Sequence, residues 1–172
     1  MSGHNRWQQI RHKKTLTDQK KGQIFSKLSH LITLAAKKGV DPKTNPTLSQ
    51  AIEKAKAANM PKENIDNALK KVSDKDQGQL EELLIEALGP GGIALRIKAI
   101  TDNRNRTLPE IKKILREHGS KIVQPGSLSW MFNQPVSLKD PASQEKLDKL
   151  LDALDDQDEV EDVSSNLLDD NL

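Results

Sequence analysis

The sequence predicts an α+β protein, in which an N-terminal three-helix bundle is followed by a small α+β domain with a mainly antiparallel sheet. Three observations lead to this. Up to residue 72, apolar residues recur at steps of three and four, the period of a helix. Beyond a polar break at residues 74–78 the apolar period shortens to two, the period of a strand. A chain of 172 residues, 34% hydrophobic, suffices for two small cores with exposed ends.

The helical domain is predicted over residues 18–75 and contains three helices. The first covers residues 18–38, where apolar side chains form one stripe. The second has Asn45 as its N-cap and Pro46 as its first residue, because an asparagine oxygen accepts from free N–H groups and proline needs no hydrogen-bond partner there. The third begins near Pro61.

The second domain, residues 76–172, opens on a predicted hairpin. Alternating residues at 83–88 and 93–99 flank the sequence GPGG, which is typical of a tight turn. A phosphate-binding loop is a poorer interpretation of GPGG, because the lysine and the following helix are missing. Thr107 and Glu110 have the spacing of a capping box and predict the start of a helix.

The remainder of this domain is predicted to complete the sheet. Short strands are expected around Ile122 and over residues 127–132, with a final strand over residues 160–163. A helix after Pro141 carries leucines on one stripe. The helices are expected to cover one face of the sheet, and the chain to end in an acidic tail.

Charge is distributed very unevenly along the chain. Residues 1–75 hold 16 Lys and Arg against 6 Asp and Glu, a net charge of +10, whereas residues 139–172 hold 3 against 12, a net charge of −9. Such a gradient bears on partners rather than on fold, and polyanions are expected at the basic end of the sequence. The acidic tail is either a solvated end or a segment that folds back and competes with nucleic acid.

The first 17 residues are predicted to form a flexible basic arm. The run MSGHNRWQQIRHKK contains no acid and only two sizeable apolar side chains, so it has little surface with which to offset its ordering entropy. It is either a solvated tail or a segment that orders on a phosphate backbone. Trp7 would stack on a base or plug the helical bundle. The residues expected to contact nucleic acid here and just beyond are His4, Arg6, Trp7, Arg11, His12, Lys13, Lys14, Lys20 and Lys21.

A second candidate contact is the sequence TDNRNRT, which begins at Thr101 and joins a strand to a helix. Free N–H groups at the helix start and two guanidinium groups would bind an anion. The alternative is structural, with Asp102 paired to an arginine and the asparagines supplying turn conformations. The residues singled out are Asn103, Arg104, Asn105 and Arg106.

Several classes of protein are disfavoured. The chain has no cysteine, and His4 and His12 lack nearby carboxylates, so neither a disulfide framework nor a metal site is expected. No nucleophile is accompanied by a base, which predicts a non-enzyme without cofactor or small-molecule substrate. No apolar run approaches the roughly 20 residues of a membrane span, so we expect a cytoplasmic protein without a membrane partner.

Five strings in order resemble the YebC family: MSGHNRW with IRHKK, AKAANMPKENI, GPGG, TDNRNRT and GSLSWMF. The resemblance covers residues 1–132 and resumes in the acidic helix LDKLLDALDDQDEVEDV. Members of that family are named probable transcriptional regulators, and a mitochondrial relative is the translational activator of cytochrome c oxidase. Members of that family carry a third domain inserted after WMF, and because Phe132 leads almost directly into the closing helix here, we expect this chain to resemble a member without it.

The resemblance implies a non-enzymatic, nucleic-acid-binding regulator of gene expression. Its target would be DNA, as the transcriptional naming implies, or ribosomal or transfer RNA, as for a ribosome-binding translation factor that relieves stalling. Because aromatic residues make up only 2% of the chain and no helix-turn-helix spacing is evident, structured RNA is slightly favoured. A hypothesis of another class is a protein-interaction module acting through the acidic C-terminal helix.

Overall fold

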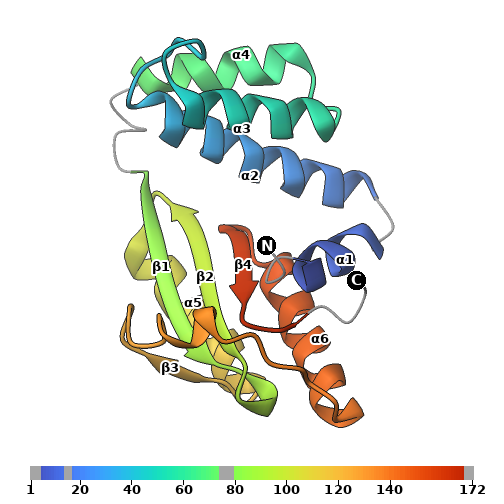
Figure 1. The fold of residues 1–172 in the computed structure, drawn as a ribbon. Coiled ribbons are helices and arrows are strands. Elements are labelled where there is room, and N and C mark those ends of the chain that lie inside the picture. Colours follow the sequence, from blue (N-terminus) through green and yellow to red (C-terminus); the bar gives the residue numbers. More distant parts are fainter. Residues whose placement is uncertain (1–4, 14–16, 74–79, 169–172) are drawn as a thin grey trace. The chain divides into compact units, whose positions relative to one another are not determined.

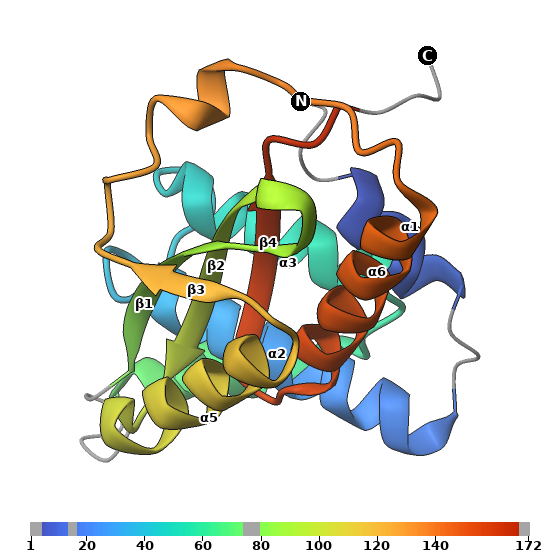
Figure 2. The same ribbon diagram turned by 90° about the horizontal axis from the view of Figure 1, so that it is seen from below.

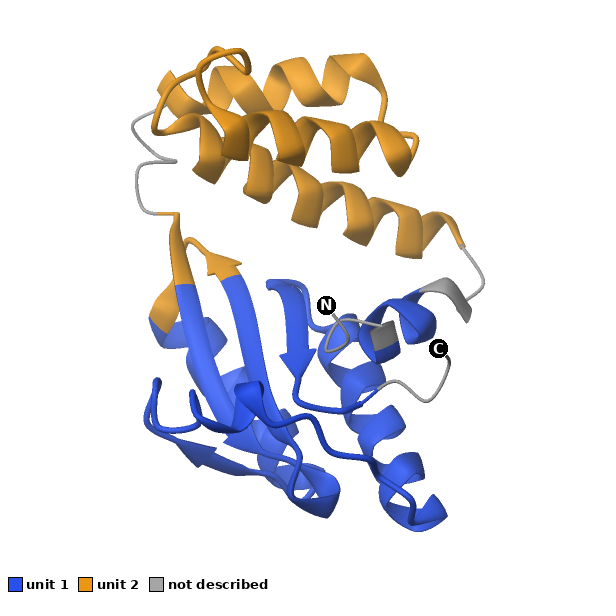
Figure 3. Cartoon of the chain, in the orientation of Figure 1, with its two compact units in different colours: residues 1–15, 83–99, 105–172 blue, residues 16–82, 100–104 orange. Residues whose placement is uncertain are grey.

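The computed structural model describes residues 5–13, 17–73 and 80–168. The chain divides into two units, which are coloured in Figure 3: unit 1 comprises residues 1–15, 83–99 and 105–172, and unit 2 comprises residues 16–82 and 100–104. The predicted domain boundary at residues 75–76 lies outside the described residues.

Unit 2 contains the predicted three-helix bundle, which the structure confirms (Figure 1). Its helices begin at polar caps, since Thr17 Oγ1 accepts from Lys20 N–H (3.2 Å) and Asn45 Oδ1 accepts from Leu48 N–H (3.1 Å). Apolar residues of all three helices form one core. The elements are α2 (Asp18–Ala36), α3 (Pro46–Ala57), α4 (Lys62–Lys70) and the short 3-10 helix η2 (Lys71–Ser73).

The second part of the chain forms the expected antiparallel sheet, with strand order β3-β1-β2-β4. The GPGG sequence is the turn of a β1–β2 hairpin, as predicted, and Gly91 adopts a left-handed φ of 70° there. β3 pairs antiparallel with β1, and β4 pairs antiparallel with β2. The strands and the turn are β1 (Glu81–Leu88), η4 (Pro90–Gly92), β2 (Ala94–Thr101), β3 (Lys121–Val123) and β4 (Val160–Ser165).

Two long helices, α5 (Arg104–Glu117) and α6 (Pro141–Asp156), cover one face of this sheet (Figure 2). Alternate residues of β1 and β2 point into a core that the two helices complete with branched side chains. The opposite face of the hairpin carries Glu86 and Arg96, which pair across the strands through Arg96 Nη2 and Glu86 Oε1 (3.1 Å). The fold class predicted from sequence is therefore confirmed.

The predicted strand over residues 127–132 is wrong. These residues form turns that lead into the 3-10 helix η5 (Met131–Asn133). The N–H of Leu128 donates to Glu86 Oε2 (3.2 Å), and the guanidinium of Arg96 lies 4.2 Å from the centroid of the Phe132 ring. The segment thus rests on side chains of the sheet instead of joining the sheet through its backbone.

The predicted capping box is also wrong, because α5 begins three residues before Thr107. Thr107 is fully buried, and Glu110 accepts from Gln157 Nε2 (3.0 Å) rather than from a cap. The chain turns into the helix where Thr101 Oγ1 accepts from Asn103 N–H (2.9 Å). Thr107 and Glu110 have the right spacing for a box, but the helix begins at Arg104, so both residues lie inside it.

The largest departure from expectation is at the N-terminus. Residues 5–13 form a helix, α1 (Asn5–Lys13), which packs against α6 and β4 in unit 1. They are therefore part of a folded unit and not a flexible arm. No helix among the three described ranges is both long enough and apolar enough to cross a membrane.

Candidate nucleic-acid interface

Three side-chain hydrogen bonds hold three chain segments together at one end of the bundle. Thr33 Oγ1 donates to the carbonyl of Ala68 (3.0 Å), which fixes the last turn of α2 beside the end of α4. Asn45 Nδ2 donates to the carbonyls of Ala35 (2.9 Å) and Gly39 (2.8 Å), which holds the start of α3 against the end of α2. The loop between α2 and α3 is therefore at this end as well.

Five exposed lysines gather where these segments meet, and we call them the basic end: Lys37, Lys38, Lys43, Lys70 and Lys71. One acid, Asp41, lies in the same loop, and its carboxylate already accepts from the N–H of Lys43 (3.0 Å). Over residues 18–73 as a whole, 11 Lys and no Arg stand against 5 Asp and Glu, a net charge of +6. Five of these 11 lysines belong to the basic end.

The lysines of the basic end differ in how far they are engaged. Lys37 Nζ donates to the carbonyl of Leu80 (2.8 Å), which gives it a structural role. Among the described residues, Lys38, Lys43, Lys70 and Lys71 form no ion pair. Cations at helix C-termini do offset the negative end of the helix dipole, but that requires one or two charges rather than five mutually repelling ones. The surplus favours binding of a polyanion.

Sequence reasoning chose other lysines of α2. Lys20 Nζ donates to Gln23 Oε1 (2.9 Å), while Lys21 is exposed. Both stand at the first turn of α2, about 24 Å along the helix from Lys37 at 1.5 Å per residue. They are therefore a separate contact from the basic end.

The arginines of the expected arm are engaged by α6. Arg6 Nε donates to Asp148 Oδ1 (2.6 Å) and its Nη2 to the other carboxylate oxygen, while Arg11 Nε lies 3.4 Å from Asp155 Oδ1. Trp7 is 2% exposed and lies in the core of unit 1. In this state it neither packs into the helical bundle nor is accessible for stacking on a base. His4 and Lys14 lie outside the described residues, as do the side chains of His12 and Lys13.

The TDNRNRT sequence forms the first turn of α5 and the residues that lead into it. Arg106 pairs with Glu159, a carboxylate that is 9% exposed. This arginine therefore has a structural ion pair, as the alternative interpretation of the sequence supposed, and Glu159 is its partner. Arg104 and Asn105 are exposed at the helix start, where the free N–H groups and the positive end of the dipole lie. The turn therefore offers one guanidinium rather than two.

Helix α6 is strongly charged, and local hydrogen bonds lower the pKa of two carboxyls, one at its N-cap and one in the helix. The hydroxyl and the backbone N–H of Ser143 donate to Asp140, the N-cap of α6, and lower the pKa of Asp140 below its usual value. A hydrogen bond from Lys149 (2.8 Å between Nζ and Oε1) lowers the pKa of Glu145. In the described part of the chain no group of three His, Cys, Asp or Glu side chains is placed to hold a metal ion.

Comparison with known proteins agrees with the resemblance seen in the sequence. The description "TACO1/YebC protein N-terminal domain" matches residues 5–75, and "TACO1/YebC second and third domain" matches residues 80–135. A protein of Petrotoga mobilis named probable transcriptional regulatory protein is 44% identical, over 88% of this chain and 61% of its own length. One of the same name in Pseudothermotoga lettingae is 45% identical, over 84% and 58%.

The solved structure of a conserved hypothetical protein from Aquifex aeolicus is also similar. It superimposes with a TM-score of 0.79 at 29% identity, covering 92% of this chain and 94% of that one. The present chain spans about three fifths of the length of the two curated relatives. Because the two family descriptions together match well over half of the chain, it belongs to the TACO1/YebC family.

Proposed function

We propose that this protein is a non-enzymatic regulator of gene expression that binds the phosphate backbone of nucleic acid through the basic end. The observation that carries the proposal is the gathering of five exposed lysines beside Asp41, four of which form no ion pair with any described residue. Relatives named probable transcriptional regulatory proteins support the same class of function.

The chemistry of the basic end favours binding to the backbone rather than reading of bases. An ammonium group is a strongly hydrated point charge, whereas the planar guanidinium is the group that pairs with base edges in two bonds. The bundle between residues 18 and 73 contains no arginine. Each phosphate that a lysine neutralises releases counterions, and these gains accumulate over the cluster. The basic end therefore binds duplex DNA and folded RNA by the same mechanism, with little dependence on sequence.

The start of α5 would supply a second contact. Arg104 is exposed there, beside free backbone N–H groups, and is suited to one phosphate. The interaction-module hypothesis is less well supported, because two carboxylates of the acidic helix, Asp148 and Asp155, are already paired with α1.

The proposal predicts a change in the salt dependence of binding. In the triple variant Lys38→Ala, Lys43→Ala, Lys70→Ala, the slope of log affinity against log salt for duplex DNA is expected to fall by about 2 to 3 units, since each phosphate contact contributes about 0.9. Affinity is expected to fall about equally for unrelated sequences. Fluorescence anisotropy of labelled duplex DNA and labelled hairpin RNA, between low and physiological salt, measures both.

A charge-matched control separates the basic end from net charge. Lys112, Lys121 and Lys139 are exposed residues of unit 1 without an ion pair in the described structure. Their triple alanine variant carries the same net charge as the first and is expected to keep the wild-type slope. Equal slopes in the two triple variants would rule out the basic end as the interface, and no binding by wild-type protein to either probe at low salt would rule out the function.

A further inference from the structure

Helix α1 is held on α6 by two arginines whose partners are carboxylates, and both arginines are groups that phosphate also binds. We propose that docked α1 is a closed state of the protein, and that nucleic acid draws α1 away from α6 by competing with Asp148 and Asp155 for Arg6 and Arg11. This inference rests on the proposed function and concerns its regulation. In the open state the two arginines would add to the contacts made by the basic end.

The helix depends on its docking site for its structure. α1 contains nine residues, fewer than the roughly 12 to 15 that an isolated helix needs to be even marginally stable in water. Its sequence NRWQQIRHK contains only two large apolar side chains, Trp7 and Ile10. Leaving α6 and unfolding are therefore one event for this segment.

The docked state of α1 has two weak points, one at Trp7 and one at the two arginines. The Trp7 ring is buried, yet its Nε1–H has no hydrogen-bond partner among the residues that the structure describes, which offsets part of the gain from burying the ring. Arg6 and Arg11 remain 32% and 34% exposed, and the Arg11 guanidinium lies 5.7 Å from the Trp7 ring centroid. A pair at this level of exposure is weakened by salt and open to competition.

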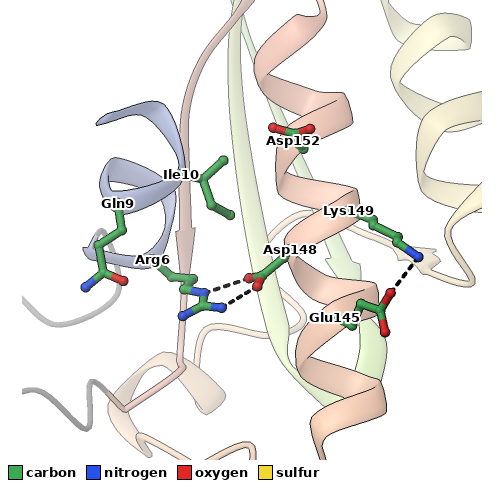
Figure 4. A pocket seen from close by; sticks show the side chains of 7 residues that line it. All are labelled: Arg6, Gln9, Ile10, Glu145, Asp148, Lys149 and Asp152. Atoms are coloured by element: carbon green, nitrogen blue, oxygen red, sulfur yellow. Dashed lines mark hydrogen bonds and ion pairs between the residues drawn. The ribbon is translucent and has the colours of Figure 1, made fainter. Parts of the chain in front are cut away.

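The arrangement of Arg6 allows a phosphate to approach it. Its guanidinium forms two parallel bonds to Asp148, the geometry with which arginine also binds phosphate. A groove of about 300 Å³ lies between α1 and α6, and Figure 4 shows Arg6 reaching across it to Asp148. The Arg6 side chain is 32% exposed beside this groove, whose lining also includes Asp152 and the Glu145–Lys149 ion pair.

The experiment uses Trp7 as a reporter and a matched pair of variants on α6. Trp130, the second tryptophan, is 61% exposed and is replaced by phenylalanine, so that emission comes from Trp7 alone. In this background Asp148→Asn weakens the pair with Arg6, while Glu145→Gln removes the same charge from α6 at a residue whose ion pair is with Lys149. Acrylamide quenching of Trp7 and binding of labelled duplex DNA and hairpin RNA are measured for all three proteins.

Saturation with whichever probe binds is expected to raise acrylamide quenching of Trp7. Asp148→Asn is expected to raise quenching without any probe, and to bind about threefold to tenfold more tightly than Glu145→Gln, because a larger fraction is already open. Binding that leaves Trp7 shielded, or equal affinity of the two variants, would overturn the inference while leaving the proposed function intact. If anisotropy showed no binding by the parent protein at low salt, both the inference and the proposed function would be wrong.

Discussion

Replacing Trp7 with alanine is expected to lower the free energy of unfolding of unit 1 by about 3 kcal/mol. Trp7 is 2% exposed and is among the largest buried side chains of a core that it shares with α5, α6 and the sheet. Truncation removes the contacts of the ring and leaves a space that the strands and α6 cannot fill. The unpaired indole N–H moderates the loss, because the alanine variant no longer buries it. Urea denaturation followed by circular dichroism measures the change.

The second tryptophan provides the control for this experiment. Trp130→Ala makes the same chemical change at a side chain that is 61% exposed, and is expected to alter the free energy of unfolding by less than about 0.5 kcal/mol. If both variants unfolded at the same urea concentration as the wild type, residues 5–13 would be the solvated arm that composition alone predicts, and the docked state of α1 would be wrong.

Replacing Glu86 with alanine is expected to cost unit 1 about 2 to 3 kcal/mol of stability. Its carboxylate is almost fully buried and accepts from Arg96 Nη2 (3.1 Å), Arg96 Nε (3.2 Å) and the N–H of Leu128 (3.2 Å). Alanine leaves a buried backbone N–H without a partner and an arginine without its counter-charge. Because Arg96 is one-third exposed, water compensates it in part, which keeps the cost below that of a fully buried pair.

The same variant is expected to loosen the segment that the carboxylate holds. Residues 127–133 rest on Glu86 and Arg96, so the fluorescence of Trp130 is expected to change in Glu86→Ala before global unfolding. Glu81→Ala, which changes an exposed acid on the same strand, is the control and is expected to be neutral within about 0.5 kcal/mol. Equal stability of the two variants in urea would show that the Glu86 carboxylate does not contribute to the stability of unit 1.

Sequence patterns predicted correctly those elements that depend on contacts between residues close together in the sequence. Asn45 and Pro46 mark the start of α3 because the cap and the first turn lie within four residues of each other. The GPGG turn joins two strands of alternating residues that are close in the sequence and lie side by side in the sheet. The bundle and hairpin were thus accessible from sequence.

The errors arose where a distant residue supplies the partner. The run from Ser127 to Phe132 alternates like a strand, but the Leu128 N–H is satisfied by a side chain of β1. Arg6 and Trp7 look like a solvated arm because the leucines and carboxylates that receive them lie on α6, more than 130 residues later. The composition of a short stretch of sequence cannot show contacts with residues that lie far away along the chain.

The basic end was missed for a related reason. Lys38, Lys43 and Lys70 are scattered in sequence and become neighbours only because α2 and α4 end side by side, fixed by Thr33 and the carbonyl of Ala68. The signal was present as lysines following the apolar stripes of the first and third helices. Charge counting placed the positive charge in the first half of the chain and singled out Lys20 and Lys21 of α2, not the lysines of the basic end.

Lysine acetylation footprinting, with mass spectrometry of the protein alone and saturated with duplex DNA or hairpin RNA at low salt, tests the central claim most directly. The account predicts that nucleic acid protects Lys38, Lys43 and Lys70 several-fold while Lys112, Lys121 and Lys139 stay reactive. Protection confined to the second set, or equal reactivity of both sets in a complex that anisotropy shows to be saturated, would contradict it.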